Sequence, residues 1–217
     1  MKNISPSNQL SQPTIISFVK DLPNICSLAG LFCAILGSYF AILQHFHIAM
    51  IGLIWAVVFD WGDGMIARRI SGRTDYQKSY GQQLDSLIDI INFGVFPTIF
   101  LLSYANLNPW FLPGAFFILG SCAVRLSYFN VFGLSDGKNY IGLNLDNNGI
   151  IFSFVFLLEV FFYQNIFSII LYIVLVILAA LNLSPIRVPK ISEKWFFLLV
   201  IYSIIVTLMY SWIHIQK

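Results

Sequence analysis

The sequence predicts an all-α integral membrane protein, a polytopic bundle of about six to eight transmembrane helices. Hydrophobic residues make up 58% of the 217-residue chain and charged residues only 10%, and the mean hydropathy is +0.79, far above that of a soluble domain. The apolar residues are also collected into long runs, most of them about as long as a helix needs to cross a bilayer. Composition and pattern therefore predict the same fold class.

The elements can be placed from these runs, which fall at residues 24–44, 48–70, 82–105, 109–131, 148–163, 165–183 and 194–213. The fifth run is short for a membrane helix, and the polar residues Gln164 and Asn165 separate it from the sixth. We expect residues 1–217 to form one domain, because the chain is too short for a membrane unit and a separate soluble one. Residues 1–22 form a polar N-terminal arm, in which residues 13–22 have the weak pattern of a short interfacial amphipathic helix.

The positive charges predict the orientation in the membrane. With the N-terminus in the cytoplasm and an odd number of spans, eleven of the 12 Lys and Arg residues lie in cytoplasmic segments, and only Lys217 lies on the other side. Such a bias follows the rule that cytoplasmic loops carry the positive charge. The three histidines, at helix ends, are expected to be interfacial, and Glu159 is expected to be a helix-packing or interface residue.

Four aspartates lie inside or at the edge of the apolar runs: Asp60 and Asp63 in the second, and Asp85 and Asp89 in the third. A carboxylate at membrane depth is costly, so it is normally paired, bound to a metal ion or part of a pathway. A single buried acid has a structural explanation, but four of them at helical spacing call for a polyvalent cation.

The aspartates share helix faces with small residues. At about 100° per residue, residues three or four apart lie on one stripe of a helix. The first stripe presents Asp60, Asp63, Gly64 and Ala67, with Arg68 at its edge, and the second presents Gly81, Asp85 and Asp89. If the two stripes face each other, they form a box of oxygen ligands with room for a bulky phosphorylated ligand beside the glycines.

The ligand types indicate which cation such a box would hold. Carboxylate oxygens suit hard ions such as Mg²⁺, Mn²⁺ or Ca²⁺, and no Cys or His lies nearby to suggest zinc. The cysteines are expected to be small core residues. A small channel or cation transporter also places acids at membrane depth, but it would not need glycines at these intervals or a basic cluster beside the acids.

The aspartate segment resembles the signature of the CDP-alcohol phosphatidyltransferases, which reads D-x-x-D-G-x-x-A-R, a spacer, and G-x-x-x-D-x-x-x-D. The chain matches its fixed positions with Asp60, Asp63, Gly64, Ala67, Arg68, Gly81, Asp85 and Asp89. The spacer, residues 69–80, is about four residues longer than is usual in the family, and we expect the added residues to lie in a polar, basic loop. Arg69 and Arg73, in this spacer, are expected to act as orientation charges.

Further segments resemble the bacterial phosphatidylserine synthase subgroup of this family. They are LDSLIDIINFGVFP (84–97), VRLSYFNV (124–131), SPIRVPK (184–190) and the N-terminal LPNICSLAGLFCAI (22–35). The chain departs from the subgroup in YIGLNLDNNGI, where Asn144 follows Gly-Leu in place of the usual proline.

The resemblance implies a reaction and a set of roles. The enzyme would transfer the phosphatidyl group of CDP-diacylglycerol to the hydroxyl of L-serine and release CMP, with two divalent metal ions, Mg²⁺ or Mn²⁺, as cofactors. Asp89 would ligate a metal ion and act as the general base on the acceptor hydroxyl. The other implied metal ligands are Asp60, Asp63 and Asp85, and the implied CDP-lipid contacts are Gly64, Ala67, Arg68 and Gly81.

The acceptor is the least determined part of this prediction. Arg125 is expected to hold the acceptor's anionic group, and Ser86 offers an oxygen for an ammonium group. Glycerol 3-phosphate, inositol phosphate or choline stay open as alternative acceptors, because Arg125, Lys138, Arg187 and Lys190 provide the positive charge that a phosphorylated acceptor needs. The expected partners are CDP-diacylglycerol, the acceptor, membrane lipids and a second copy of the chain, with no nucleic acid. The expected location is the inner membrane, with the active site facing the cytoplasm.

Overall fold

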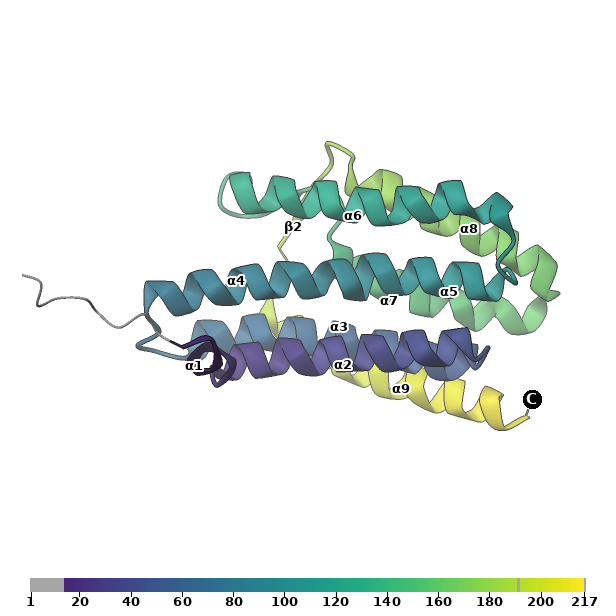
Figure 1. The fold of residues 1–217 in the computed structure, drawn as a ribbon, viewed down its shortest axis with the longest axis horizontal. Coiled ribbons are helices and arrows are strands. Elements are labelled where there is room, and N and C mark those ends of the chain that lie inside the picture. The colour runs from purple at the N-terminus through teal and green to yellow at the C-terminus, as the bar shows by residue number, and fades with distance from the viewer. Residues whose placement is uncertain (1–13, 191, 217) are drawn as a thin grey trace, which may run out of the picture.

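The computed structural model describes residues 14–190 and 192–216, which form a bundle of helices running side by side along the long axis of the molecule (Figure 1). The α-helices are α1 (Ile15–Val19), α2 (Leu22–Ile42), α3 (Phe46–Arg69), α4 (Asp75–Ile90), α5 (Phe96–Tyr104), α6 (Leu112–Phe132), α7 (Leu145–Phe156), α8 (Gln164–Asn182) and α9 (Phe196–Gln216). The shorter elements are the π-helical turn η1 (Ile91–Val95), the 3-10 turns η2 (Pro109–Phe111), η3 (Leu157–Phe161) and η4 (Glu193–Trp195), and the strands β1 (Asn139–Ile141) and β2 (Arg187–Pro189).

The predicted fold class is confirmed. Within the described residues, six helical segments are long and apolar enough to cross a membrane: 22–42, 46–69, 75–104, 109–132, 164–182 and 196–216. The predicted fifth run, 148–163, corresponds to α7 and the turn η3, and it is shorter than these six. Of the predicted interfacial segment 13–22, residue 13 lies outside the described residues, and the short helix α1 covers 15–19.

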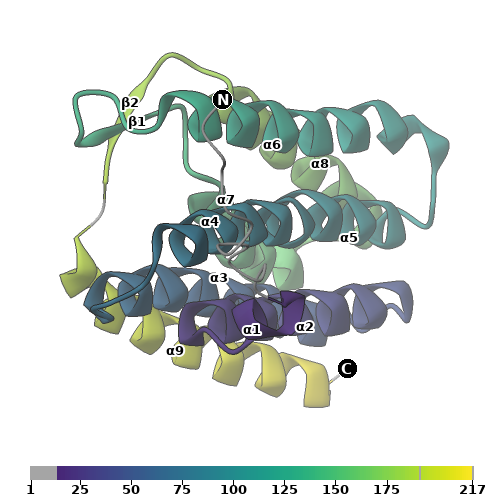
Figure 2. The same cartoon turned by 60° about the vertical axis from the view of Figure 1, so that its left-hand side comes forward.

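The helices pack in three layers, which two views show in the same order (Figures 1 and 2). One outer layer contains α6 and α8, the middle layer contains α4, α5 and α7, and the other outer layer contains α2, α3 and α9. α2 and α3 approach each other closely: a Cβ atom on Gly52 would lie 2.6 Å from the carbonyl oxygen of Cys33. Glycine at this position therefore lets the two helix backbones touch.

An aromatic core fills the end of the bundle remote from the aspartates. Phe100 is fully buried, and its ring meets those of Phe152 and Phe156 edge-on, with centroids 5.2 and 4.9 Å apart. Beside this core, Nε2 of His47 lies 3.4 Å from Oε2 of Glu159. His47 is only 6% exposed, so the prediction that it is interfacial is wrong: its helix begins at the bundle end but points this side chain inward, where Glu159 provides a polar partner.

The loop between the two aspartate pairs is shorter than predicted. Only residues 70–74 separate α3 from α4, because residues 75–80 form the first turns of α4. Thr74 starts this helix with a capping box: its Oγ1 accepts from the backbone N–H of Gln77 at 3.2 Å, and Oε1 of Gln77 accepts from the backbone N–H of Thr74 at 2.8 Å. The additional residues therefore lengthen a helix rather than a loop.

Two irregular features position the polar end of the bundle. The π-helical turn η1 begins directly after Asp89 and Ile90 and joins α4 to α5, with Asn92 and Gly94 buried. At the same end, β1 and β2 pair antiparallel, with Tyr140 opposite Val188. This small ribbon ties the α6–α7 connection to the α8–α9 connection (Figure 2).

Candidate active site

Three aspartates from neighbouring helices form a carboxylate cluster. One oxygen from each of Asp60 on α3 and Asp85 and Asp89 on α4 lies within 4.8 Å of the other two. Oδ1 of Asp89 is buried, and none of the residues that the structure describes donates a hydrogen bond to it. Carboxylates this close repel one another unless they are protonated or share a cation, and an all-oxygen set suits a hard divalent ion. The residues present thus fit the divalent cation that the sequence predicts.

The fourth aspartate of the signature lies to one side of this cluster. Asp63 is 6% exposed, and its Oδ2 accepts a hydrogen bond from Oγ of Ser27 on α2. Its carboxylate also interacts with that of Asp85. Asp63 is therefore within reach of the cluster through Asp85, while α2 holds its other side.

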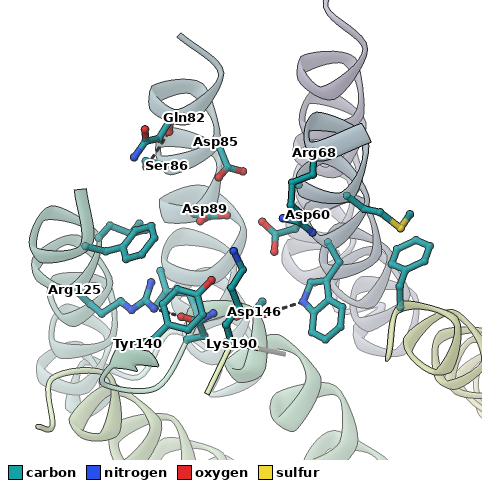
Figure 3. A pocket seen from close by; sticks show the side chains of 18 of the residues that line it. Asp60, Arg68, Gln82, Asp85, Ser86, Asp89, Arg125, Tyr140, Asp146 and Lys190 are labelled. Carbon is teal, nitrogen blue, oxygen red and sulfur yellow. Dashed lines mark hydrogen bonds between the residues drawn. The ribbon is translucent and has the colours of Figure 1, made fainter. Parts of the chain in front are cut away.

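Two cavities meet at the carboxylate cluster. The first has a volume of about 180 Å³ and opens between α3, α4, α6 and the start of α7 (Figure 3). The second has a volume of about 190 Å³ and lies between α2, α3 and α4. Gly64 and Asp85 line both cavities, so they form the partition between them.

The predicted ligand-binding residues divide between these cavities. Ala67, Gly81 and Asp63 line the second cavity, whereas Arg68, Ser86 and Arg125 line the first. The structure thus brings the small residues of the signature together and places Arg68 apart from Ala67 and Gly81. The hydroxyl of Ser86 has two acceptors within hydrogen-bond distance, Oδ1 of Asn130 at 3.1 Å and the carbonyl oxygen of Gln82 at 3.0 Å.

Arg73 belongs to the second cavity and is more than an orientation charge. Its Nη2 lies 2.6 Å from Oδ2 of Asp21, and its Nε donates to the same oxygen at 2.9 Å. A Cβ atom on Gly81 would lie 2.9 Å from Nη2 of Arg73 and 3.0 Å from Oδ1 of Asn24. This arrangement could not be predicted from the sequence, because Asp21 and Arg73 are far apart in the chain.

The wall of the first cavity that faces the carboxylate cluster, here called the far wall, consists of Arg125, Tyr140, Asn144 and Asp146. Arg125 on α6 is 7% exposed, and its Nη2 donates to Oδ1 of Asn144. Its guanidinium carbon lies 5.5 Å from the ring centroid of Phe129 and 5.5 Å from that of Tyr140. Burial raises the pKa of the Tyr140 phenol, so this ring stays neutral beside the guanidinium.

Two charged residues of this cavity were not predicted as site residues of the serine enzyme. Oδ2 of Asp146, in the first turn of α7, accepts a hydrogen bond of 2.7 Å from the indole Nε1 of Trp61. Lys190, directly after β2, extends into the cavity toward the carboxylates (Figure 3). The only sequence signal for Asp146 was its position two residues after Asn144, where the chain departs from the subgroup pattern.

An apolar groove of about 910 Å³ adjoins the first cavity. It runs along α9, where Leu198, Ile201 and Ile205 line it, and it shares Trp61 and Lys190 with the first cavity. An apolar groove that ends at a polar site is shaped for a molecule with a charged head and a hydrocarbon tail.

The fold and the site together define an integral membrane enzyme for a phosphorylated, lipid-like ligand. The chain belongs to the CDP-alcohol phosphatidyltransferase family, whose model matches residues 20–215. It is thus a phosphatidyltransferase of phospholipid biosynthesis and not a channel or cation transporter.

Several relatives carry more specific names. The chain is 30% identical over 190 residues to archaetidylserine synthase of Methanothermobacter thermautotrophicus, covering 84% of this chain and 75% of that protein. It is 26% identical over 181 residues to a CDP-diacylglycerol–serine O-phosphatidyltransferase of Helicobacter pylori, covering 80% and 74%. It is also 27% identical over 139 residues to phosphatidylcholine synthase of Legionella pneumophila, covering 64% and 51%.

Proposed function

We propose that this enzyme transfers the phosphatidyl group of CDP-diacylglycerol to the hydroxyl of L-serine and releases CMP. The observation that supports this most is the pairing of a carboxylate cluster with a cavity whose far wall holds one buried arginine. A single guanidinium suits a carboxylate, because its planar fork matches the two oxygens. The relatives named as archaetidylserine and phosphatidylserine synthases support the same acceptor.

We propose that Asp60, Asp63, Asp85 and Asp89 hold two divalent ions, Mg²⁺ or Mn²⁺. When bound, such ions screen the charge of the pyrophosphate and stabilise the departing CMP phosphate. Asp85 suits a bridging role, because it lies in the cluster and also interacts with Asp63.

The proposed general base is Asp89. Its Oδ1 has no hydrogen-bond partner, and the residue lines the first cavity, into which the acceptor would enter. As the acceptor oxygen attacks phosphorus, Asp89 takes the hydroxyl proton, and the bond from phosphorus to the CMP oxygen breaks with its electron pair on CMP. The carboxylate thereby removes the proton of a weak nucleophile at the moment when the new bond forms.

The two cavities and the groove divide the substrates between them. The CMP part fits the second cavity, where Gly64, Ala67 and Gly81 leave the backbone accessible. The acyl chains fit the apolar groove along α9, with Arg68 and Lys190 beside the phosphates. The acceptor takes the first cavity, with Arg125 on its carboxylate.

The experiment that tests this function uses the purified protein, CDP-diacylglycerol, Mn²⁺ or Mg²⁺, and one radiolabelled acceptor at a time. We expect a labelled phospholipid and stoichiometric CMP with L-serine. Transfer to glycerol 3-phosphate, inositol phosphate or choline in place of serine would show that the acceptor is wrong and the reaction class correct. The relative named phosphatidylcholine synthase makes choline a necessary arm of this test.

We further propose that the protein lies in the inner membrane, with its N-terminus and its active-site end facing the cytoplasm. We also propose that the enzyme is a homodimer. The distribution of Lys and Arg supports the orientation. Labelling of single cysteines from either side of sealed vesicles tests the first proposal, and cross-linking in the membrane tests the second.

A further inference from the structure

Asp146 has no place in the metal cluster or in the signature, yet it lines the first cavity. It stands in the first turn of α7, where the positive end of the helix favours an anion. Its Oδ2 is held by the indole of Trp61 at 2.7 Å. A carboxylate that is held in the cavity and is not itself one of the proposed metal ligands is available to bind a cationic group of the acceptor.

The opposite charge in this wall is equally fixed. The guanidinium of Arg125 lies beside the rings of Phe129 and Tyr140, and its Nη2 donates to Asn144. Its Nε is buried, and no acceptor among the residues that the structure describes takes its hydrogen. Asn144 and Asp146 belong to the same short segment, so one end of α7 both orients the guanidinium and carries the carboxylate. The far wall thus presents one anion and one cation to the same cavity.

We propose that Asp146 binds the ammonium group of the acceptor while Arg125 binds its carboxylate, so that the far wall selects an amino-acid zwitterion. This inference rests on the proposed function, because it concerns the acceptor of the same site. It replaces Ser86 as the partner of the ammonium group, since the Ser86 hydroxyl, which lies beside Asn130 and the Gln82 carbonyl, carries no charge. A full negative charge also binds ammonium more strongly than a hydroxyl does.

The test is Asp146→Asn in the full-length enzyme. Its amide oxygen still accepts from Trp61, so the variant removes the charge and keeps the shape. We expect the KM for L-serine to rise about 10- to 150-fold, with the KM for CDP-diacylglycerol and the Mn²⁺ concentration for half-maximal activity unchanged. Asp146→Ser, which also retains a hydrogen-bond acceptor, serves if the asparagine variant is not recovered.

Acceptor analogues separate the two charges. Ethanolamine keeps the ammonium group and lacks the carboxylate, whereas glycerate keeps the carboxylate and lacks the ammonium group. Each analogue is tested as a substrate or as a competitive inhibitor against L-serine, which gives its KM or Ki. In Asp146→Asn, the affinity for ethanolamine should fall and the affinity for glycerate should not. In Arg125→Lys, the affinity for glycerate should fall and the affinity for ethanolamine should not.

The control is Asp136→Asn, which removes a carboxylate paired with Arg187 at 3.3 Å in an exposed position at the same end of the molecule. It should leave the KM for serine unchanged. An unchanged serine KM in Asp146→Asn, or a raised Mn²⁺ requirement with the serine KM unaltered, overturns the inference and leaves the serine transferase intact. Failure of the wild-type enzyme to use serine overturns the proposed function instead.

Discussion

The two sides of the first cavity are built in different ways. The carboxylate cluster comes from two consecutive long helices, α3 and α4, and helical spacing places its residues on one face of each helix. The far wall comes from α6, β1 and the start of α7, which meet only because the chain returns to this end of the bundle. A side built by local geometry suits chemistry that is common to a family, and a side assembled from separate segments can change its residues one by one to suit a particular acceptor.

Removing divalent ions should have the largest effect and should act on the carboxylate cluster alone. Without a cation, the close carboxylates and a diphosphate repel each other, so we expect turnover to fall to background in excess chelator and to return with Mn²⁺ or Mg²⁺. CMP release measures this effect. Turnover that persists in chelator would show that the cluster is not a metal site.

The next largest effect should come from Asp89→Asn, which keeps the shape of the cluster and removes the proposed base. We expect kcat to fall by about 10²- to 10⁴-fold, with a much smaller loss of CDP-lipid binding. Initial rates and titration of CDP-diacylglycerol into the variant separate the two quantities. An equal loss of both would make Asp89 chiefly a ligand.

Arg125→Ala tests the far wall. Loss of a charge-assisted hydrogen bond worth roughly 1.5–3 kcal/mol should raise the KM for serine by about 10- to 150-fold, with little change in the KM for CDP-diacylglycerol. Arg125→Lys keeps the charge without the planar fork and should recover only part of the loss. If both KM values rise together, the two sides of the cavity do not divide the substrates as proposed.

The smallest effect should come from Gly64→Leu, at the partition between the cavities. We expect the Kd for CDP-lipid to rise by about tenfold through bulk alone, because an added Cβ atom would meet just the flexible end of Arg68, at 3.3 Å, among the described residues. Gly120→Leu on α6 is the matched control, since, apart from the adjacent backbone of its own helix, no atom of the described residues lies within 4 Å of its added Cβ. Unchanged CDP-lipid binding in Gly64→Leu would reduce this glycine to a packing residue.

The same contrast explains how much the sequence could predict. Long apolar runs determine the helices, and i, i+3 and i+4 spacing determines which aspartates share a face, so the fold class and the two aspartate-bearing faces could be predicted. That Asp60 meets Asp85 and Asp89 while Asp63 lies to one side also depends on how α3 and α4 pack. Asp146 and the pairing of Arg73 with Asp21 could not be found this way, because each depends on which distant helices become neighbours. The predicted loop at 69–80 failed for a local reason, the capping box at Thr74 and Gln77, which starts α4 earlier.

The π-helical turn η1 sets the rotational phase of one long helical segment. An extra residue in a turn displaces everything after it by about 100° around the axis relative to an unbroken α-helix. Gly81, Asp85 and Asp89 precede this turn, and Phe96 and Phe100 of the aromatic core follow it. The segment α4–η1–α5 therefore directs its acids toward the cavity and its rings toward the core. Deletion of a single residue between 91 and 95 would rotate the acids relative to the rings by about 100°, so both could no longer face their sites. It would do so without changing any side chain that binds substrate.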